Sequence, residues 1–228
     1  RLFLEGAVKL PTATDPEEAD RSAVPEGSAD LPASLVHPIL QRAKKSSRSD
    51  YAWAYAMFGA GLSAEEVASL ARSHSIQESK QHLLQINTGT ARQVPLNQWI
   101  LDKRYGTPTN NPLTQWLKNR KDSESAMFLN AEGQPLSATE LRQTWQQLTE
   151  DLVAPQGYQP RVEQARDTWC VEMLVKGVAL ENLSILSGIE RERLQPYVRR
   201  AKEKAAIEQA SRLDRGAREG DRAASDPN

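Results

Sequence analysis

The chain has 228 residues, of which 39% are hydrophobic and 26% are charged, and its formal net charge is -1. This length fits one full domain, with room for a smaller additional piece. No apolar run approaches the roughly 18 residues of a membrane span, which argues against a membrane protein. The near-neutral charge is also far from the strongly basic footprint of a tight nucleic-acid binder.

Charge and composition change sharply near residue 34. Residues 1–34 hold three basic and seven acidic residues, so the rest of the chain carries a net charge of +3. Pro, Ala, Ser, Asp, Glu and Gly dominate residues 11–34, a composition that buries too little apolar surface to fold. We therefore expect residues 1–34 to be an acidic, disordered linker. The apolar stretch 1–10 would be the last element of a missing N-terminal region, and the chain the C-terminal part of a longer protein.

Cysteine and histidine usage points to a cytoplasmic protein without cofactors. The single Cys170 excludes an internal disulfide and fits a reducing compartment. No charged-then-apolar leader follows Arg1. His37, His74 and His82 are scattered and form no plausible metal set with one cysteine. We expect no metal ion and no small-molecule cofactor.

The pattern becomes helical from Leu35. Apolar residues recur there at helical spacing, and a basic cluster suited to a helix C-terminus follows them. This first helix contains Leu35, Val36, Ile39 and Leu40, then Lys44, Lys45 and Arg48. A second helix is expected over Ser49–Ala60. Ser63 followed by Glu66 predicts a capping box that starts a third helix.

The period then changes to that of a β-hairpin. Strands are expected over His82–Ile86 and Ala91–Pro95, joined by a turn at Asn87–Thr90. We expect a helix to begin at Pro95–Leu96 and a brief strand over Ala126–Leu129. The first of these would carry Trp99, Ile100 and Tyr105, and a later short helix Leu113, Trp116 and Leu117.

The C-terminal part reads as helices. Ser137 and Glu140 make a second capping box. A further helix contains Arg166 and ends at Gly177, and short helical pieces lead to Tyr197. The charged tail, residues 206–228, is expected to be helical at first and frayed after Leu213. The prediction is a mainly α domain over residues 35–205 with one small antiparallel β-sheet (α+β).

The order of these elements resembles the catalytic domain of tyrosine recombinases, the phage integrase and Xer-like enzymes. The resemblance covers residues 35–205 and rests on four pieces that occur in the right order with the right gaps. They are Gly59-Ala60-Gly61-Leu62 with Glu65–Leu70, Arg92-Gln93-Val94-Pro95-Leu96, Ala165-Arg166-Asp167-Thr168-Trp169, and Leu186 to Tyr197.

The resemblance implies a reaction in which a tyrosine hydroxyl attacks a DNA backbone phosphate. The products are a 3′-phosphotyrosyl link and a free 5′-hydroxyl. Negative charge develops on the non-bridging oxygens, so the site needs positive charge around them. The family supplies two arginines, a hairpin lysine and two further His or His/Trp positions besides the nucleophile.

Only two of these six family positions keep their residue type in this chain. Arg166 matches the second arginine and Tyr197 the nucleophile. The other four positions fall on Ser63, Asn87, Glu163 and Gly188. Each lost donor costs about 3–4 kcal/mol of transition-state stabilisation by analogy with an oxyanion-hole group, and such losses are not additive. Even so, a defect of about ten-thousandfold or more is expected.

The preferred hypothesis is a tyrosine-recombinase-like domain that binds double-stranded DNA but has lost strand cleavage. It would associate with the nucleoid, with a second copy or a recombinase as a further candidate partner. The side chains expected to contact DNA are Arg92, Lys44, Lys45, Lys118, Arg120, Lys121, Arg199 and Arg200. Two alternatives stay open. One is an active recombinase that uses Tyr197 with Arg92 or Lys80 as a relocated cation; the other is a protein-interaction scaffold.

Several single residues also have a structural interpretation. Ser63 is explained by its helix cap, and Arg166 either binds phosphate or pairs with Glu163 or Asp167. Arg92 is either a replacement cation or a solvated strand arginine. Tyr197 packs its ring at a helix end beside Pro196 unless it is the nucleophile. All five tryptophans are expected to pack in the core rather than stack on bases. They are Trp53, Trp99, Trp116, Trp145 and Trp169.

Overall fold

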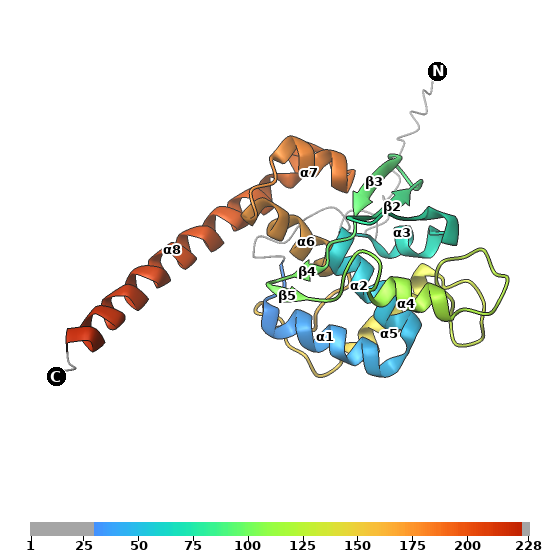
Figure 1. Cartoon of the computed structure of the whole chain (residues 1–228), viewed down its shortest axis with the longest axis horizontal. Coiled ribbons are helices and arrows are strands. Elements are labelled where there is room, and N and C mark those ends of the chain that lie inside the picture. The colour runs from blue at the N-terminus through green and yellow to red at the C-terminus, as the bar shows by residue number, and fades with distance from the viewer. Residues whose placement is uncertain (1–29, 225–228) are drawn as a thin grey trace, which may run out of the picture.

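The computed structural model describes residues 30–224, with side chains described for residues 30–213. The apolar stretch 1–10 and all but the last five residues of the predicted linker lie outside the described residues. Within them, most elements are helices, and a small antiparallel sheet lies at one edge of the domain (Figure 1), which confirms the predicted mainly α fold class.

The first three helices begin close to where the sequence places them. They are α1 (Ala33–Ser46), α2 (Arg48–Ala60) and α3 (Ala64–Ser69). The Ser63–Glu66 capping box is present, and it confirms the interpretation of Ser63 as the cap of α3. Gly61 ends α2 in the left-handed conformation, with φ at 64°.

The predicted hairpin forms two strands of a three-stranded sheet. A 3₁₀ turn, η1 (Arg72–His74), leads into β1 (Ser75–Gln77), and β2 (His82–Ile86) pairs with β1 on one side and with β3 (Arg92–Pro95) on the other. Every pairing is antiparallel. The register places Ile86 opposite Arg92, so Arg92 lies at the end of the sheet that is nearest the hairpin tip.

The segment after β3 does not form the predicted helix. It forms a second hairpin instead, from β4 (Trp99–Ile100) and β5 (Lys103–Arg104). The Leu96 amide donates to the carbonyl of His82 at 2.8 Å, which prolongs the extended path. Tertiary hydrogen bonds therefore override the local preference for helix.

The segment before the second capping box also differs from its prediction. Residues 126–129 form only isolated bridges, Ala71 with Ala126 and Leu129 with Pro135, rather than a strand. The helices on either side are α4 (Pro112–Asn119) and α5 (Ala138–Leu148), and the predicted capping box of Ser137 starts α5.

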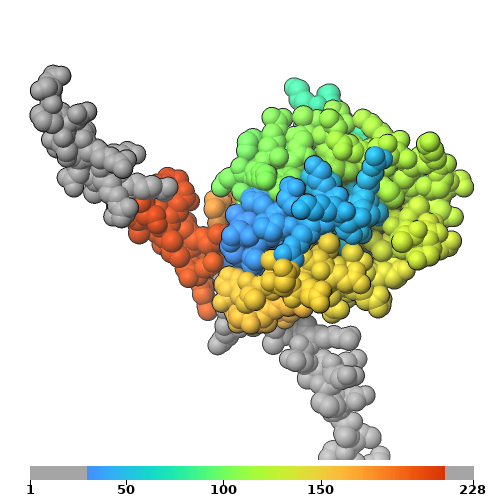
Figure 2. Space-filling model, turned by 90° about the horizontal axis from the view of Figure 1, so that it is seen from below, coloured from blue at the N-terminus to red at the C-terminus, as the bar shows by residue number. Residues whose placement is uncertain are grey.

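The C-terminal elements carry the chain past the sheet and then away from the body. They are α6 (Glu163–Val175), α7 (Leu180–Ser187), the 3₁₀ turn η2 (Arg191–Leu194) and α8 (Gln195–Ala224). Tyr197 lies in the first turn of α8. Figures 1 and 2 show α8 standing out from the domain, where Ile207 and Leu213 are exposed.

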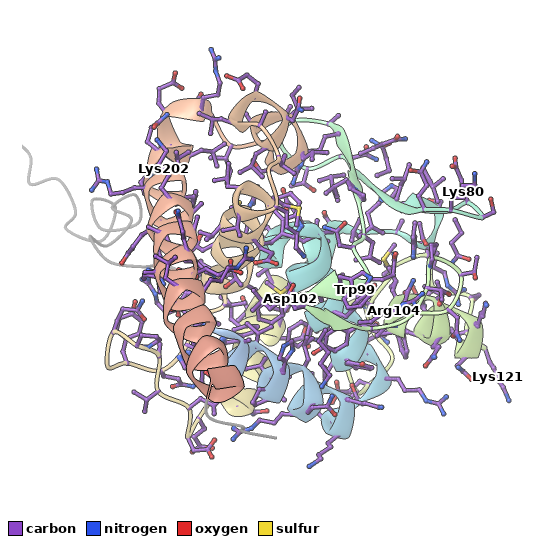
Figure 3. All side chains as sticks on the ribbon, turned by 60° about the vertical axis from the view of Figure 1, so that its left-hand side comes forward. Lys80, Trp99, Asp102, Arg104, Lys121 and Lys202 are labelled. Carbon is purple, nitrogen blue, oxygen red and sulfur yellow. The ribbon has the colours of Figure 1, made fainter. Side chains whose placement is uncertain are left out.

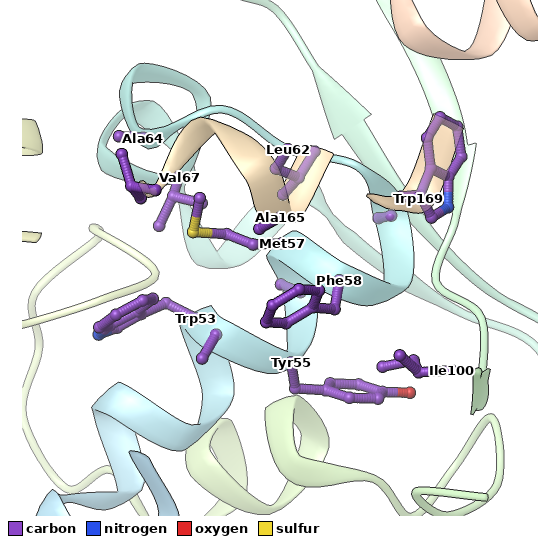
Figure 4. Packing of buried hydrophobic residues seen from close by; sticks show 14 of the residues in the cluster. Trp53, Tyr55, Met57, Phe58, Leu62, Ala64, Val67, Ile100, Ala165 and Trp169 are labelled. Atoms are coloured by element: carbon purple, nitrogen blue, oxygen red, sulfur yellow. The ribbon is translucent and has the colours of Figure 1, made fainter. Parts of the chain in front are cut away.

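Buried aromatic side chains tie α2 to the elements around it. Figure 4 shows Trp53, Tyr55 and Phe58 of α2 packed in one cluster with Trp169 of α6 close by. The predicted core role holds for Trp53, Trp145 and Trp169, which are buried. Trp116 is half-buried and donates its indole N–H to the Met127 carbonyl. For Trp99 the prediction is wrong, because 53% of its surface is exposed.

We expect Gly61→Ala to lower the free energy of unfolding by about 2–5 kcal/mol, because it adds strain and a clash. A Cβ at residue 61 would lie 2.2 Å from Cε3 of Trp169. Gly177→Ala is the matched control, because Gly177 also has a positive φ but no heavy atom within 4 Å of its would-be Cβ. Urea denaturation should show a loss of about 1–2 kcal/mol for the control. Equal losses for both variants would contradict the role of Trp169.

Candidate active site

A cleft of about 510 Å³ lies where five elements meet. The start of α3, the β2–β3 tip, the start of α6, the end of α7 and the first turn of α8 form its walls. It gathers five of the six positions singled out in the sequence. They are Ser63, Glu163, Arg166, Gly188 and Tyr197. Asn87 does not line the cleft; its side chain is exposed and contacts Gln85 and His74.

A buried carboxylate, Glu66, holds two arginines at the back of the cleft. Arg92 Nη2 lies 2.7 Å from Glu66 Oε1, and Arg166 Nη1 lies 3.5 Å from Glu66 Oε2. Arg92 and Glu66 are buried, with 4% and 8% of their side chains exposed, and Arg166 is half-buried, with 19% exposed. The interpretation of Arg92 as a solvated strand arginine is therefore wrong. The acidic partner of Arg166 is Glu66, and neither Glu163 nor Asp167, the two partners considered from the sequence, forms an ion pair with it.

The same two arginines also hold the end of α7. Arg92 Nε donates to the Leu186 carbonyl at 2.8 Å, and Arg166 Nη2 donates to the Ser187 carbonyl. The last carbonyls of a helix lack partners within the helix and carry its negative dipole end. Each guanidinium thus binds a carbonyl at the end of α7 as well as the carboxylate of Glu66. Of the Arg166 donors, Nε is buried without a hydrogen-bond partner.

Tyr197 reaches the cleft but its hydroxyl is engaged. The hydroxyl donates a hydrogen bond to Asp167 Oδ1 at 2.6 Å. Burial, together with the neighbouring Asp167 carboxylate, raises the pKa of Tyr197 above its ordinary value. Burial also raises the pKa of Asp167, to about 6, although the hydrogen bond from Tyr197 opposes this shift. A tyrosine in this setting keeps its proton.

The remaining family positions offer no cation. The Ser63 hydroxyl accepts the Glu66 amide in the helix cap. Gly188 ends α7 in the left-handed conformation, and a Cβ there would lie 3.2 Å from Arg92 Nη1. Arg92 therefore fills the space beside residue 188. Glu163 lies on the rim, 3.9 Å from Arg142 Nε.

The charges that line the cleft are predominantly negative. Three guanidiniums face five carboxylates there, a formal net charge of -2. The cations are Arg92, Arg166 and Arg193, and the anions are Glu65, Glu66, Glu163, Asp167 and Glu190. Sequence reasoning used Glu66 only as a cap and Asp167 only as a pairing option, so it missed that both contact the family residues.

The other predicted DNA contacts lie outside the cleft, and they differ in whether an ion pair inside the protein already binds them. The Arg120 side chain is 1% exposed and is bound by Asp122 and by backbone carbonyls. Arg200 pairs with Asp30 at 2.7 Å, and Lys204 with the same carboxylate at 2.9 Å. Burial opposes ionisation of Asp30, but these two partners leave its pKa lowered. Lys44, Lys45, Lys118, Lys121 and Arg199 are exposed and form no ion pair within residues 30–213.

A metal site and a membrane span would each need a particular arrangement of the described residues. Among them, no cluster of three or more His, Cys, Asp or Glu side chains is arranged to hold a metal ion. No helix in the same part of the chain is both long and apolar enough to cross a membrane.

A family model described as "Phage integrase family" matches residues 30–208. This span is well over half of the chain. The chain belongs to the phage integrase family. The matched residues include α1–α7 and the start of α8, so the cleft lies inside the matched region. No curated protein matches the chain in sequence.

Solved structures of tyrosine recombinases share the fold. XerA recombinase is 13% identical with a TM-score of 0.61, over 79% of this chain and 64% of that one. The Tn1549 transposon integrase in complex with circular intermediate DNA is 19% identical with a TM-score of 0.57, over 78% and 65%. XerH bound to a palindromic difH substrate is 15% identical with a TM-score of 0.61, over 81% and 52%. This chain thus spans less than two thirds of each of these relatives.

Because the pKa of Asp167 is raised in the folded protein, the stability of the protein should depend on pH. A carboxyl group that binds its proton more tightly when folded stabilises the fold at low pH, and this stabilisation is lost as pH rises through the folded pKa. With pKa values of 3.8 unfolded and about 6 folded, the loss between pH 4 and 7 is roughly 2 kcal/mol. Asp167→Asn cannot ionise but still accepts from Tyr197, so it should become more stable than the wild type as pH rises.

Denaturation of both proteins at several pH values between 4 and 7 measures this difference. Burial lowers the pKa of His82 to about 4, which gives the wild type an opposite pH dependence. Since both proteins keep His82, its contribution cancels in the difference. A difference in unfolding free energy that stays constant with pH would contradict the assignment.

Proposed function

We propose that this chain is a DNA-binding member of the phage integrase family that does not cleave DNA strands. The observation that carries the proposal is the balance of charge around Tyr197. Five carboxylates and three guanidiniums line the cleft, and the tyrosine hydroxyl is bound to one of those carboxylates.

Strand cleavage would need the opposite electrostatics. A phosphodiester entering the cleft is negative, and its attack by tyrosine adds charge to the non-bridging oxygens. The guanidiniums of Arg92 and Arg166 already pair with Glu66 and bind the carbonyls at the end of α7. Glu163 adds a further negative charge at a family position where a proton carrier is expected. The cleft therefore opposes both phosphate binding and the developing charge.

Binding of DNA does not depend on these catalytic groups. Phosphate contacts from exposed lysines and arginines supply most of the non-specific affinity of DNA-binding proteins. Five of the predicted contacts are exposed and unpaired in the part of the chain with described side chains. The Tn1549 integrase structure is a complex with circular intermediate DNA, and the XerH structure is bound to a palindromic difH substrate. On this proposal the protein acts at the cytoplasmic nucleoid, alone or with a second copy or a recombinase.

One observation favours a second candidate, an active recombinase with a rearranged site. The cleft brings Tyr197, Arg166 and a second cation, Arg92, together. The 2.6 Å contact of Tyr197 with Asp167 is also the geometry of a general base that takes the phenolic proton. We rank this candidate second, because the high pKa of Tyr197 and the acidic lining both oppose it.

A trapping experiment separates the two candidates. Nicked duplexes from a random-sequence pool release a short fragment after attack and leave the protein covalently attached. We expect no adduct on a denaturing gel, since a rate defect of about ten-thousandfold or more follows from the missing cations. An adduct that disappears in Tyr197→Phe would establish the active recombinase.

DNA binding is tested on an intact duplex across salt concentrations. If Lys and Arg side chains contact phosphates, the logarithm of the binding constant should fall linearly with the logarithm of the salt concentration. Tyr197→Phe should bind equally well, because the proposed contacts do not use the hydroxyl. No binding of the duplex even at low salt would instead favour the protein-interaction scaffold.

A further inference from the structure

Cations lie beside aromatic rings in one region outside the cleft, where Trp99 is exposed, Tyr51 is half-buried and Tyr105 is buried beneath them. We call this surface the basic-aromatic strip. It is formed by α1, the start of α2, the β4–β5 hairpin and the residue that follows β5. Its members are His37, Lys44, Tyr51, Trp99, Lys103, Arg104 and Tyr105.

Contacts between neighbouring side chains make the strip continuous. Lys44 Nζ lies 5.8 Å from the ring centroid of Tyr51, and Lys103 Nζ lies 6.0 Å from that of Tyr105. The two tyrosines are near enough that Tyr51 adds to the effect of burial in raising the pKa of Tyr105 to about 12. His37 joins α1 to the hairpin: its ring stacks on Tyr105, with 2.7 Å between Nδ1 and the tyrosine hydroxyl.

The hairpin presents an exposed aromatic ring next to a cation. Trp99 lies opposite Arg104 in the strand register, and Figure 3 shows both on the hairpin with Asp102. The turn between the strands holds Leu101 and Asp102 at φ values of 45° and 64°. Such values are uncommon for residues other than glycine and are often found where function requires a fixed backbone. Trp99 is the tryptophan with the largest exposure in the described structure.

The cations of the strip are free to accept an anion. Lys44, Lys103 and Arg104 are exposed and form no ion pair within residues 30–213. Lys118 continues the positive charge, because it and Arg104 both donate to carbonyls of the loop 106–110, at Thr109 and Gly106. Asp102 in the turn is a carboxylate among these groups. This excess of unpaired cations contrasts with the acidic cleft.

No member of the strip lines the cleft. The part of the strip on α1 and α2 is also distant from it along α2: Tyr51 lies in the first turn, and the helix ends at Ala60, just before the cleft residue Ser63. The 13 residues of α2 span about 20 Å at 1.5 Å per residue. The hairpin part follows Asn97, whose amide donates to the Gly59 carbonyl near the other end of α2. The strip and the cleft therefore use different side chains.

We propose that the basic-aromatic strip is a nucleic-acid-binding surface separate from the cleft. The proposal rests on the function proposed above and places the DNA contacts on a particular face. Lysine and arginine side chains contact the phosphate backbone. Trp99 stacks on a base that is unpaired, as aromatic residues do in proteins that bind single strands. Duplex and single-stranded DNA share the backbone chemistry and differ only in the stacking.

Paired charge reversals test the location of the surface. K103E/R104E changes two exposed cations of the hairpin, and K202E/R212E makes the same change of net charge on α8, at two exposed residues that are not among the predicted DNA contacts. Figure 3 shows Lys202 on α8, on the opposite side of the view from Arg104. With a duplex probe, we expect the hairpin variant to bind roughly tenfold more weakly and its salt slope to fall by about 2. The α8 variant should keep the wild-type slope.

Further variants guard against misfolding and test the stacking. K44E/K45E lies on α1 instead of the hairpin and should also lower the slope by about 2. Trp99→Ala should weaken binding of a single-stranded oligonucleotide by about 5- to 150-fold and leave duplex binding nearly unchanged. Thermal melting checks that each variant is folded.

The possible outcomes are distinct. If the wild type binds neither probe at low salt, the proposed function itself fails. If it binds and only K202E/R212E weakens the binding, the strip is the wrong surface while the function stands. A salt slope that is lowered by about 2 in both K103E/R104E and K44E/K45E, with both variants folded, supports the strip.

Discussion

The Glu66 carboxylate is the contact on which the arrangement of the cleft depends. It caps α3 through its contact with Ser63, and it pairs with Arg92 of β3 and Arg166 of α6. The two arginines in turn bind the end of α7. Four elements are therefore fixed by one buried group. Removing one partner of a buried charge pair usually costs about 3–5 kcal/mol, because the other charge is left uncompensated.

This network explains why retained family residues are weak evidence for catalysis. Arg166 and Tyr197 occupy their positions, yet each already forms a hydrogen bond inside the protein. Arg166 bonds to Ser187, and Tyr197 bonds to Asp167. A guanidinium that already neutralises a carboxylate and a helix end has little potential left for a phosphate. The same residue types thus serve the fold and not the reaction.

The sequence allowed much of this to be predicted and left out what depends on distant pairing. Both capping boxes, the β2–β3 hairpin and the convergence of Arg166 with Tyr197 rest on local patterns or fixed spacing. The β4–β5 hairpin was missed because hydrogen bonds to distant segments override the local pattern. The burial of Arg92 was missed for a related reason: its partners lie 26 and 94 residues away. Spacing alone does not show which acidic residue meets which basic one.

The charges of the domain are divided between two surfaces. In the cleft, carboxylates outnumber guanidiniums around a tyrosine that keeps its proton. On the basic-aromatic strip, Lys44 and Lys103 lie near aromatic rings and lack carboxylate partners among the described residues. An attractive potential for a polynucleotide therefore lies on the side where there is no nucleophile. If DNA binds on that side, the loss of catalytic cations in the cleft costs no binding affinity, because the two groups of charges act on different parts of the surface.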